Sequence, residues 1–275
     1  MKKHHRIHYI LLSLIFFTAT PMCDGDTQQE FKRESMIEQV IRKGTLKVGM
    51  STFLPWAMRD RNGELIGFEI DLAKRLAKDM GVEAEFVPTQ WSGIIPALIT
   101  GKFDIIIGGM GITPGRNLKV NFSIPYDHTG MSLVASRELA AGFKSLDDFN
   151  NPNVTVVVRM GSTSAAAVKK YMPKAILRQF DDESQAVQEL LNGKAHAFVS
   201  SAPLPAFQAL RYPEKLFLPL KENFTKEPIA FAIGKGDFDS YNFLNNWITV
   251  VTAEGWIQER KHYWFETDEW RNRIK

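Results

Sequence analysis

The sequence is almost free of cysteine and has no hydrophobic run long enough to cross a membrane. Cys23 is the only cysteine among 275 residues, so no intrachain disulfide can form. The longest apolar run, Ile10 to Phe17, is well short of the roughly 20 residues that a membrane-spanning helix needs. His128 and His196 stand singly, without the spacing typical of metal ligands. We therefore expect no metal site and no cofactor.

The chain also lacks an excess of charge beyond its first residues. The formal charge of +3 equals the contribution of Lys2, Lys3 and Arg6, so the remainder is balanced. The pI of 8.8 is then no evidence for a nucleic-acid partner, and no basic face interleaved with aromatic residues is present. A Gly-x-Ser-x-Gly elbow and a lysine-containing phosphate-binding loop are missing too.

Residues 1–23 have the pattern of an export signal. A basic start is followed by the apolar run and by the small residues Thr18-Ala19-Thr20. We therefore expect an exported protein. Lipid anchoring at Cys23 is the alternative, although Thr20-Pro21-Met22 matches the bacterial lipoprotein pattern poorly.

A stretch from Phe103 to Arg116 predicts an anion-binding corner. Ile105–Ile107 is typical of a short strand buried on both faces, and the glycines that follow it expose main-chain N–H groups to a ligand. Thr113 is a suitable N-cap for a helix that begins at Pro114. The alternative is an ordinary strand-to-helix turn. The residues expected to bind an anion here are Gly109, Gly111, Thr113 and Arg116, whose planar guanidinium suits a carboxylate.

The rest of the chain predicts alternating strands and helices. Such alternation implies a largely parallel sheet in each half, and about 250 residues exceed one comfortable core, so two lobes are expected. Extended runs at 131–136 and 229–233 are expected to join the lobes as a hinge. The predicted strands are 46–50, 84–87, 154–159, 176–180 and 197–200; the predicted helices are 66–80, 91–99, 164–171, 183–191, 205–210, 238–252 and 256–264.

The chain resembles the amino-acid-binding proteins of ABC importers, bacterial solute-binding family 3. The matching segments span nearly the whole mature chain: 44–49, 67–73, 101–105, 113–116, 122–126, 161–163 and the final helices near Trp264. This resemblance implies the α/β, two-lobed periplasmic-binding-protein fold (type II), with two mostly parallel sheets and a two-strand hinge. The implied organisation is a signal peptide (1–23), a polar segment (24–42), lobe 1 (43–133 and 229–275) and lobe 2 (134–228). A periplasmic monomer that delivers a small carboxylate ligand to a membrane permease is expected.

The resemblance also implies roles for individual residues. Arg116 should bind the α-carboxylate of the ligand, with Ser162 and Thr163 contacting the same group from the other lobe. Such an anion would stabilise the closed state. Phe53 and Trp91 fall where aromatic residues of the family flank the ligand's side chain; their alternative is an ordinary place in the core.

Position 201 departs from the family. Ser201 stands where an aspartate usually pairs with the ligand's α-amino group, so an ammonium would lack its usual counter-ion. Arg159 adds a second cation near the cleft, which favours a dicarboxylate or 2-oxo acid. Alternatively, Arg159 reaches solvent or pairs with Asp127, Asp181 or Asp182.

Two other functions share this fold. Cyclohexadienyl dehydratases resemble the carboxyl half, but Met131 and Leu204 (or its neighbour Pro203) occupy the places of their lysine and glutamate, and neither moves a proton. We therefore expect no enzyme. A ligand-sensing subunit of a signalling system is the third possibility.

Overall fold

The computed structural model describes residues 34–274. The expected signal peptide and Cys23 lie outside the described residues, as does the beginning of the polar segment. The rest of that segment contains α1 (Met36–Lys43), which Ser35 caps through a capping box with Glu38.

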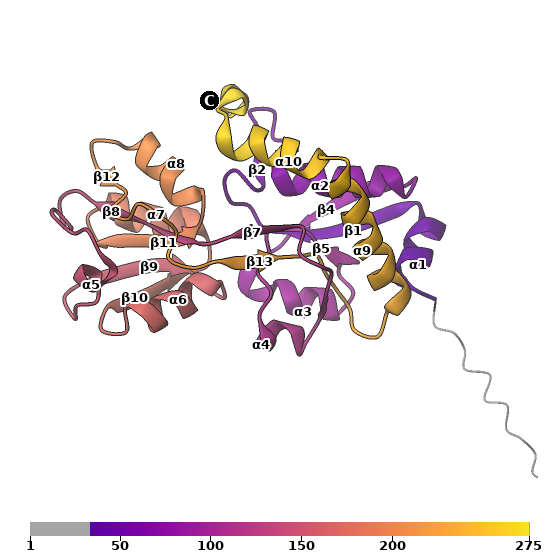
Figure 1. Ribbon diagram of the computed structural model, residues 1–275, viewed down its shortest axis with the longest axis horizontal. Coiled ribbons are helices and arrows are strands. Elements are labelled where there is room, and N and C mark those ends of the chain that lie inside the picture. The colour runs from indigo at the N-terminus through magenta and orange to yellow at the C-terminus, as the bar shows by residue number, and fades with distance from the viewer. Residues whose placement is uncertain (1–33, 275) are drawn as a thin grey trace, which may run out of the picture. The chain divides into compact units, whose positions relative to one another are not determined.

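Two five-stranded sheets define two lobes (Figure 1). The sheet of the first lobe has the order β4 (Glu83–Pro88), β1 (Thr45–Met50), β5 (Ile105–Ile106), β14 (Ala232–Ile233) and β6 (Asn121–Phe122). The sheet of the second lobe has the order β10 (Ile176–Phe180), β9 (Thr155–Arg159), β11 (Ala197–Ser201), β8 (Met131–Ser136) and β12 (Leu216–Phe217). A small hairpin, β2 (Met58–Arg59) with β3 (Leu65–Ile66), adjoins the first.

The prediction of largely parallel sheets is confirmed, with one reversed strand in each. β14 is antiparallel to both of its neighbours, and β8 is antiparallel to both of its own. Each reversed strand follows the antiparallel ribbon of β7 (Asp127–Thr129) and β13 (Glu227–Ile229), which runs between the sheets in Figure 1. The chain therefore enters each sheet from the ribbon against the direction of the other strands.

The connection between the lobes differs from the expectation. The run 131–136 is β8 and lies wholly in the second sheet, while the run 229–233 is divided between β13 and β14. Strand β7 lies just before the first run, and β13 overlaps the start of the second run at Ile229. The expected lobe boundaries, after residues 133 and 228, stay predictions and fall within β8 and β13.

Helices cover both sheets, and the predicted helices are present with small shifts of their ends. The helix expected at 66–80 begins at Phe68 because Leu65 and Ile66 pair in β3. Those of the first lobe are α2 (Phe68–Asp79), the 3-10 turn η1 (Trp91–Gly93), α3 (Ile94–Ile99), α4 (Pro114–Asn117), α9 (Phe238–Ala253), α10 (Trp256–Lys261), the π-helix η2 (His262–Glu266) and the 3-10 helix η3 (Glu269–Arg273). Those of the second lobe are α5 (Leu146–Phe149), α6 (Thr163–Tyr171), α7 (Glu183–Leu191) and α8 (Leu204–Arg211).

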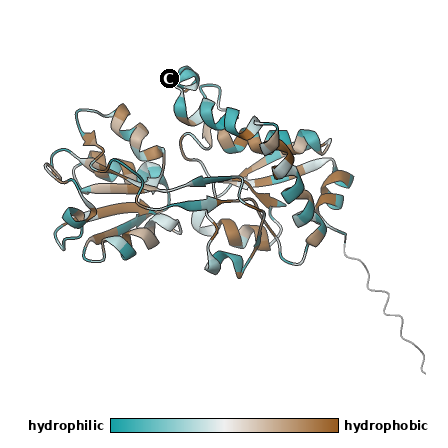
Figure 2. Ribbon diagram, in the orientation of Figure 1, coloured by the Kyte–Doolittle hydropathy of each residue, from teal (hydrophilic) through white to brown (hydrophobic). Residues whose placement is uncertain are grey.

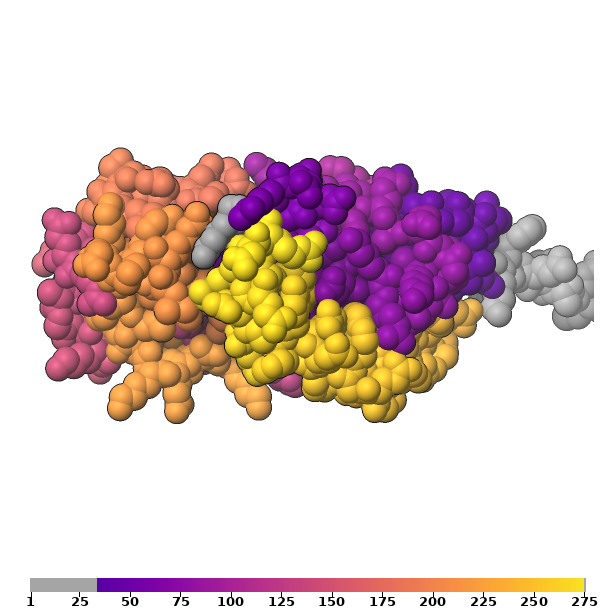
Figure 3. Space-filling view, turned by 90° about the horizontal axis from the view of Figure 1, so that it is seen from above, coloured from indigo at the N-terminus to yellow at the C-terminus, as the bar shows by residue number. Residues whose placement is uncertain are grey.

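The C-terminal segment packs against the first lobe. The Arg61 backbone N–H donates to the Arg273 carbonyl at 3.0 Å, and Figure 3 shows these last residues beside the N-terminal part of the lobe. Trp270 also meets Phe207 of α8 edge to face, with 5.4 Å between ring centroids. The end of the chain thus contacts both lobes.

Apolar residues, brown in Figure 2, are frequent in the strands of both sheets and also occur on parts of the helices. Ile105 and Ile106 are fully buried and Ile107 nearly so, which confirms the predicted buried strand, although β5 ends one residue earlier than predicted, at Ile106. Phe231, between β13 and β14, is fully buried, and its ring centroid lies 4.8 Å from that of Tyr126 and 5.9 Å from that of Trp247.

We predict that Phe231→Ala lowers the free energy of unfolding by about 3–5 kcal/mol, because it leaves a cavity among fully buried rings. Phe238→Ala is the matched control, since Phe238 is 74% exposed, and it should change stability by less than about 0.5 kcal/mol. Urea denaturation followed by tryptophan fluorescence measures both. Equal effects of the two substitutions would contradict the assigned core.

Candidate functional site

Arg116 is held at the carboxyl end of β5 by the predicted local structure. Thr113 caps α4 by accepting a hydrogen bond from the Arg116 backbone N–H, and Pro114 is the first helical residue, so the predicted helix start is confirmed. The guanidinium donates from Nη1 to the Gly111 carbonyl (2.8 Å) and from Nη2 to the Gly161 carbonyl (3.1 Å). Because Gly161 belongs to the second lobe, Arg116 connects the two lobes.

The surroundings of Arg116 make its charge costly. Burial lowers the pKa of its guanidinium to about 10, and Arg159 adds to this decrease, whereas the Glu227 carboxylate opposes it. The charged form of Arg116 is therefore less stable here than it would be in water.

Glu227, the first residue of β13, supplies a carboxylate beside the residues predicted to bind one. Its Oε2 accepts from the Thr163 hydroxyl at 2.7 Å and its Oε1 from the Thr225 hydroxyl at 3.0 Å. A Cβ at Gly111 would lie 3.3 Å from Glu227 Oε2 and 3.6 Å from Arg116 Nη1, so both charged groups face the same small space. Sequence analysis did not identify Glu227; its only signal was its place before the second extended run.

Arg159 lies against the two predicted aromatic residues. It is the last residue of β9 and only 5% exposed, with its Cζ 5.0 Å from the Phe53 ring centroid and 4.5 Å from that of Trp91. Trp91 also lies 5.8 Å from the Cζ of Arg116. Phe53 and Trp91 themselves are largely buried, at 7% and 5% exposure. The structure thus brings both arginines to one aromatic surface.

The partner of Arg159 is Glu183, which was not among the partners considered from sequence. Arg159 Nε lies 3.6 Å from Glu183 Oε1, which also accepts from the Ser200 hydroxyl at 2.8 Å. Asp127, one of the partners considered, instead pairs with Lys261 at 2.7 Å. Burial raises the pKa of Glu183, and Arg159 opposes this increase. Because Arg159 is paired with Glu183, it does not add a free positive charge beside Arg116, and the argument for a purely acidic ligand loses its basis.

The buried acid Glu69 forms a hydrogen bond with the glycine-rich turn after β5. Glu69 of α2 is fully buried and accepts from the Tyr126 hydroxyl with both oxygens, at 2.8 and 2.9 Å, and from the Gly109 backbone N–H. The Gly109 N–H, expected to face a ligand, is therefore directed at Glu69. Burial raises the pKa of Glu69 to about 8.

The remaining predicted residues lie around the same region. The Ser162 hydroxyl donates to the Arg159 carbonyl at 2.6 Å, and Ser162 and Thr163 stand at the start of α6. Ser201, at the end of β11, is half-buried, and its side chain makes no hydrogen bond with any residue in the described range. Met131 and Leu204 occupy the positions at which cyclohexadienyl dehydratases have their lysine and glutamate. Both side chains are buried and apolar.

Asp71, Asp104 and His196 have structural partners. Asp71 accepts from the Trp264 indole N–H at 2.7 Å, and Asp104 accepts from the Lys47 backbone N–H at 2.8 Å. His196 Nδ1 accepts from the Thr155 backbone N–H at 3.1 Å. Within residues 34–274, no cluster of three His, Cys, Asp or Glu side chains is arranged for a metal ion.

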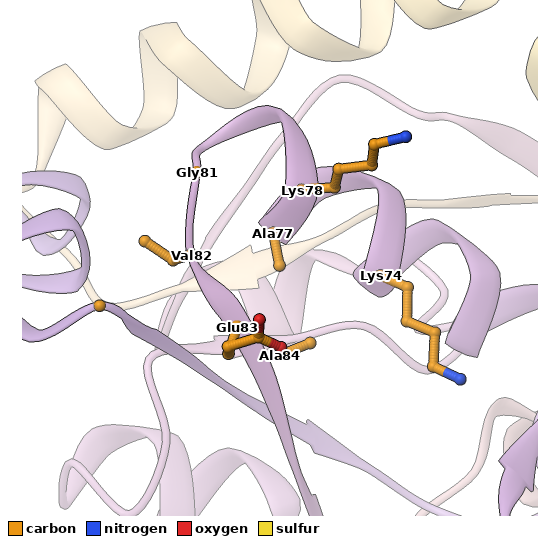
Figure 4. A pocket seen from close by; sticks show the side chains of 8 residues that line it. Lys74, Ala77, Lys78, Gly81, Val82, Glu83 and Ala84 are labelled. Carbon is orange, nitrogen blue, oxygen red and sulfur yellow. The ribbon is translucent and has the colours of Figure 1, made fainter.

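A cleft of about 600 Å³ adjoins the Arg159 region. It is lined from the first lobe by residues including Phe53 and Met58, and from the second by residues including Glu183 and Tyr212. A separate hollow of about 500 Å³ lies on α2 and β4, where the Lys74 and Lys78 side chains extend outward (Figure 4). None of the predicted site residues lines this second hollow.

The fold and cleft define a two-lobed α/β protein of the type II periplasmic-binding-protein class. Residues 46–267 match the model of the bacterial extracellular solute-binding proteins, family 3, and the chain belongs to this family. None of the helices in the described part of the chain is long and apolar enough to cross a membrane.

Three similar proteins illustrate the relationship. The chain is 27% identical to the L-cystine-binding protein TcyJ of Escherichia coli K12 over 93% of this chain and 96% of that protein. It is 42% identical, with a TM-score of 0.78, to a putative binding component of an ABC transporter from Wolinella succinogenes complexed with lysine, over 84% of this chain and 99% of that one. A third match, at 42% identity, a TM-score of 0.77 and the same coverages, is the ancestral amino acid-binding protein AncCDT-1, a precursor of cyclohexadienyl dehydratase.

The raised pKa of Glu69 predicts a pH dependence of stability. Because the folded-state pKa of about 8 lies above the ordinary value of 4.5, the folded chain binds this proton more tightly than the unfolded chain does. The contribution is complete below about pH 4.5 and is lost as the pH rises toward 8. Glu69→Gln should remove this loss, which we expect to be on the order of 3–4 kcal/mol between pH 5 and 8.

Urea denaturation at several pH values between 5 and 8 compares the variant with the wild type. Glu64→Gln, at an exposed position, is the control and should keep the wild-type profile. If the Glu69→Gln and wild-type profiles run parallel, Glu69 does not retain its proton in the folded state.

Proposed function

We propose that the protein is an exported solute-binding protein that captures a small carboxylate-bearing ligand, an amino acid or a related organic acid, for an ABC importer. The observation that supports it most is the position of Arg116, a partly desolvated guanidinium that contacts both lobes. A carboxylate bound here would gain charge-assisted hydrogen bonds in a poorly solvated place. Membership of the solute-binding family supports the same conclusion.

The carboxylate would be held from both lobes. Arg116 contributes from the first lobe, and the first-turn N–H groups of α6, which begins at Thr163, contribute from the second. The ribbon β7–β13 is then the hinge, since it links the two sheets with few residues. Ligand contacts made with both lobes favour the closed arrangement over an open one.

Glu227 favours an amino acid over a plain carboxylic acid. Its carboxylate faces the same space as Arg116, so together they offer one anion and one cation to a zwitterion. Ser201 has no charge and cannot act as a counter-ion for an α-ammonium group. Glu227 would take this role.

The cellular role follows from the family and the amino-terminal pattern. Residues 1–23 would direct export to the periplasm and be removed, and the protein would act as a monomer beside a membrane permease. A ligand-sensing role would use the same cleft with a different partner. A dehydratase role has less support, because Met131 and Leu204 offer no proton donor; a prephenate assay that yields phenylpyruvate would overturn this judgement.

We predict that Arg116→Ala weakens ligand binding by roughly tenfold to a hundredfold or more, the loss of about 1.5–3 kcal/mol for a charge-assisted hydrogen bond. A thermal-shift screen of amino acids and organic acids on the wild type first identifies the ligand, and calorimetry then compares the variants. Arg61→Ala, at an exposed arginine, is the control. Unchanged affinity in Arg116→Ala would refute the proposed anchor.

Glu227→Gln tests whether an ammonium is recognised. We expect this variant to lose about tenfold or more in affinity for the amino acid, since the counter-ion is removed, and to lose little for the des-amino analogue. Calorimetry with both compounds on both proteins makes the comparison. If the variant weakens the two compounds equally, or strengthens both, Glu227 does not receive the ammonium group.

A further inference from the structure

The guanidinium of Arg159 occupies a place suited to a ligand's cation. Its Cζ lies over the rings of both Phe53 and Trp91, at 5.0 and 4.5 Å from their centroids. Aromatic faces attract cations within about 6 Å, and two faces strengthen the attraction. Arg159 comes from β9 of the second lobe, whereas both rings belong to the first lobe. The aromatic pair is thus filled by a side chain of the protein itself.

The carboxylate of Glu183 lies beside the two rings, where it can pair with a cation. Glu183 Oε1 lies 3.6 Å from Arg159 Nε, and Glu183 Oε2 and Arg159 Nε are both buried without a hydrogen-bond partner among the described residues. Arg159 Nη1 reaches the Ser51 hydroxyl only at 3.4 Å. The aromatic pair and Glu183 therefore form a cation site whose present occupant leaves hydrogen-bonding groups unused.

This cation site borders open space. Phe53 and Glu183 both line the cleft of about 600 Å³, so removal of the Arg159 side chain would leave a vacancy next to it. The vacancy would have two aromatic faces and an unpaired carboxylate. A side chain that ends in a guanidinium or an ammonium fits this chemistry.

We propose that Arg159 determines specificity by acting as a built-in occupant of the side-chain subsite, which excludes ligands with long cationic side chains. This inference rests on the proposed function, because it places the subsite beside the carboxylate anchor Arg116. A related solved structure contains bound lysine, whereas this protein should reject both lysine and arginine. Its own ligand is then a carboxylate compound with a short or uncharged side chain.

The test is a gain of binding. Arg159→Ala should bind arginine and lysine with at least roughly tenfold higher affinity than the wild type, since the released cation site can pair with their side chains. Ethylguanidinium, the fragment close to the one removed, should raise the melting temperature of Arg159→Ala and leave that of the wild type unchanged. Arg159→Lys retains a cation at the position and should continue to exclude both amino acids.

A double variant examines the role of the acid. In Arg159→Ala/Glu183→Gln the gained affinity for arginine should be lost, because the receiving carboxylate is removed. Binding of arginine or lysine by the wild type at the affinity of Arg159→Ala overturns the proposal. So does a folded Arg159→Ala that gains no affinity for either. If Arg159→Ala fails to fold, the wild type still tests the proposal: binding of arginine or lysine as tight as that of the wild-type ligand overturns it, and rejection of both supports it.

The same experiments separate this inference from the proposed function. If Arg116→Ala abolishes binding of the wild-type ligand while Arg159→Ala gains nothing, the carboxylate anchor stands and the occupant is wrong. If Arg159→Ala gains affinity for arginine and the double variant Arg116→Ala/Arg159→Ala retains that affinity in full, the cation site is supported and Arg116 is not the carboxylate anchor.

Discussion

The candidate site depends on how the protein stabilises two guanidinium groups, those of Arg116 and Arg159, that have lost much of their hydration. Removing a charge from water is unfavourable unless opposite charge or hydrogen bonds replace the lost hydration. Arg159 obtains opposite charge from Glu183 and lies against two aromatic faces, whereas Arg116 donates hydrogen bonds to carbonyl oxygens and lies near Glu227. The arrangement of the surrounding elements can be understood as a means of bringing these partners together from distant parts of the chain.

The two arginines differ in how far a carboxylate of the protein already neutralises them, and therefore in their capacity to bind a ligand. Glu183 lies within ion-pair distance of Arg159, whereas no carboxylate in the described part of the chain comes within 4.0 Å of Arg116. The Glu227 carboxylate near Arg116 is shared with the Thr163 and Thr225 hydroxyls. Arg116 thus retains more capacity for an incoming anion than Arg159 does.

Local sequence was sufficient for local structure. Three consecutive isoleucines identified β5, and the Thr113-Pro114 pair identified the start of α4, because burial pattern and capping act over a few residues. The connecting ribbon was misplaced by a few residues, since an extended run has the same appearance whether it pairs within a lobe or between lobes. Glu183 and Glu227 were missed for the same reason: an ion partner is fixed by packing across many residues, and neither acid carries a local signal.

The reversed strand β14 has a consequence for the order in which the protein forms. It lies between β5 and β6 and completes the first sheet, yet it follows in sequence the whole of the second. The amino-terminal lobe therefore cannot close its sheet until roughly residue 233 has been synthesised, while the second lobe needs only a continuous segment. Contacts so remote in sequence slow folding, so we expect the first lobe to complete its sheet after the second.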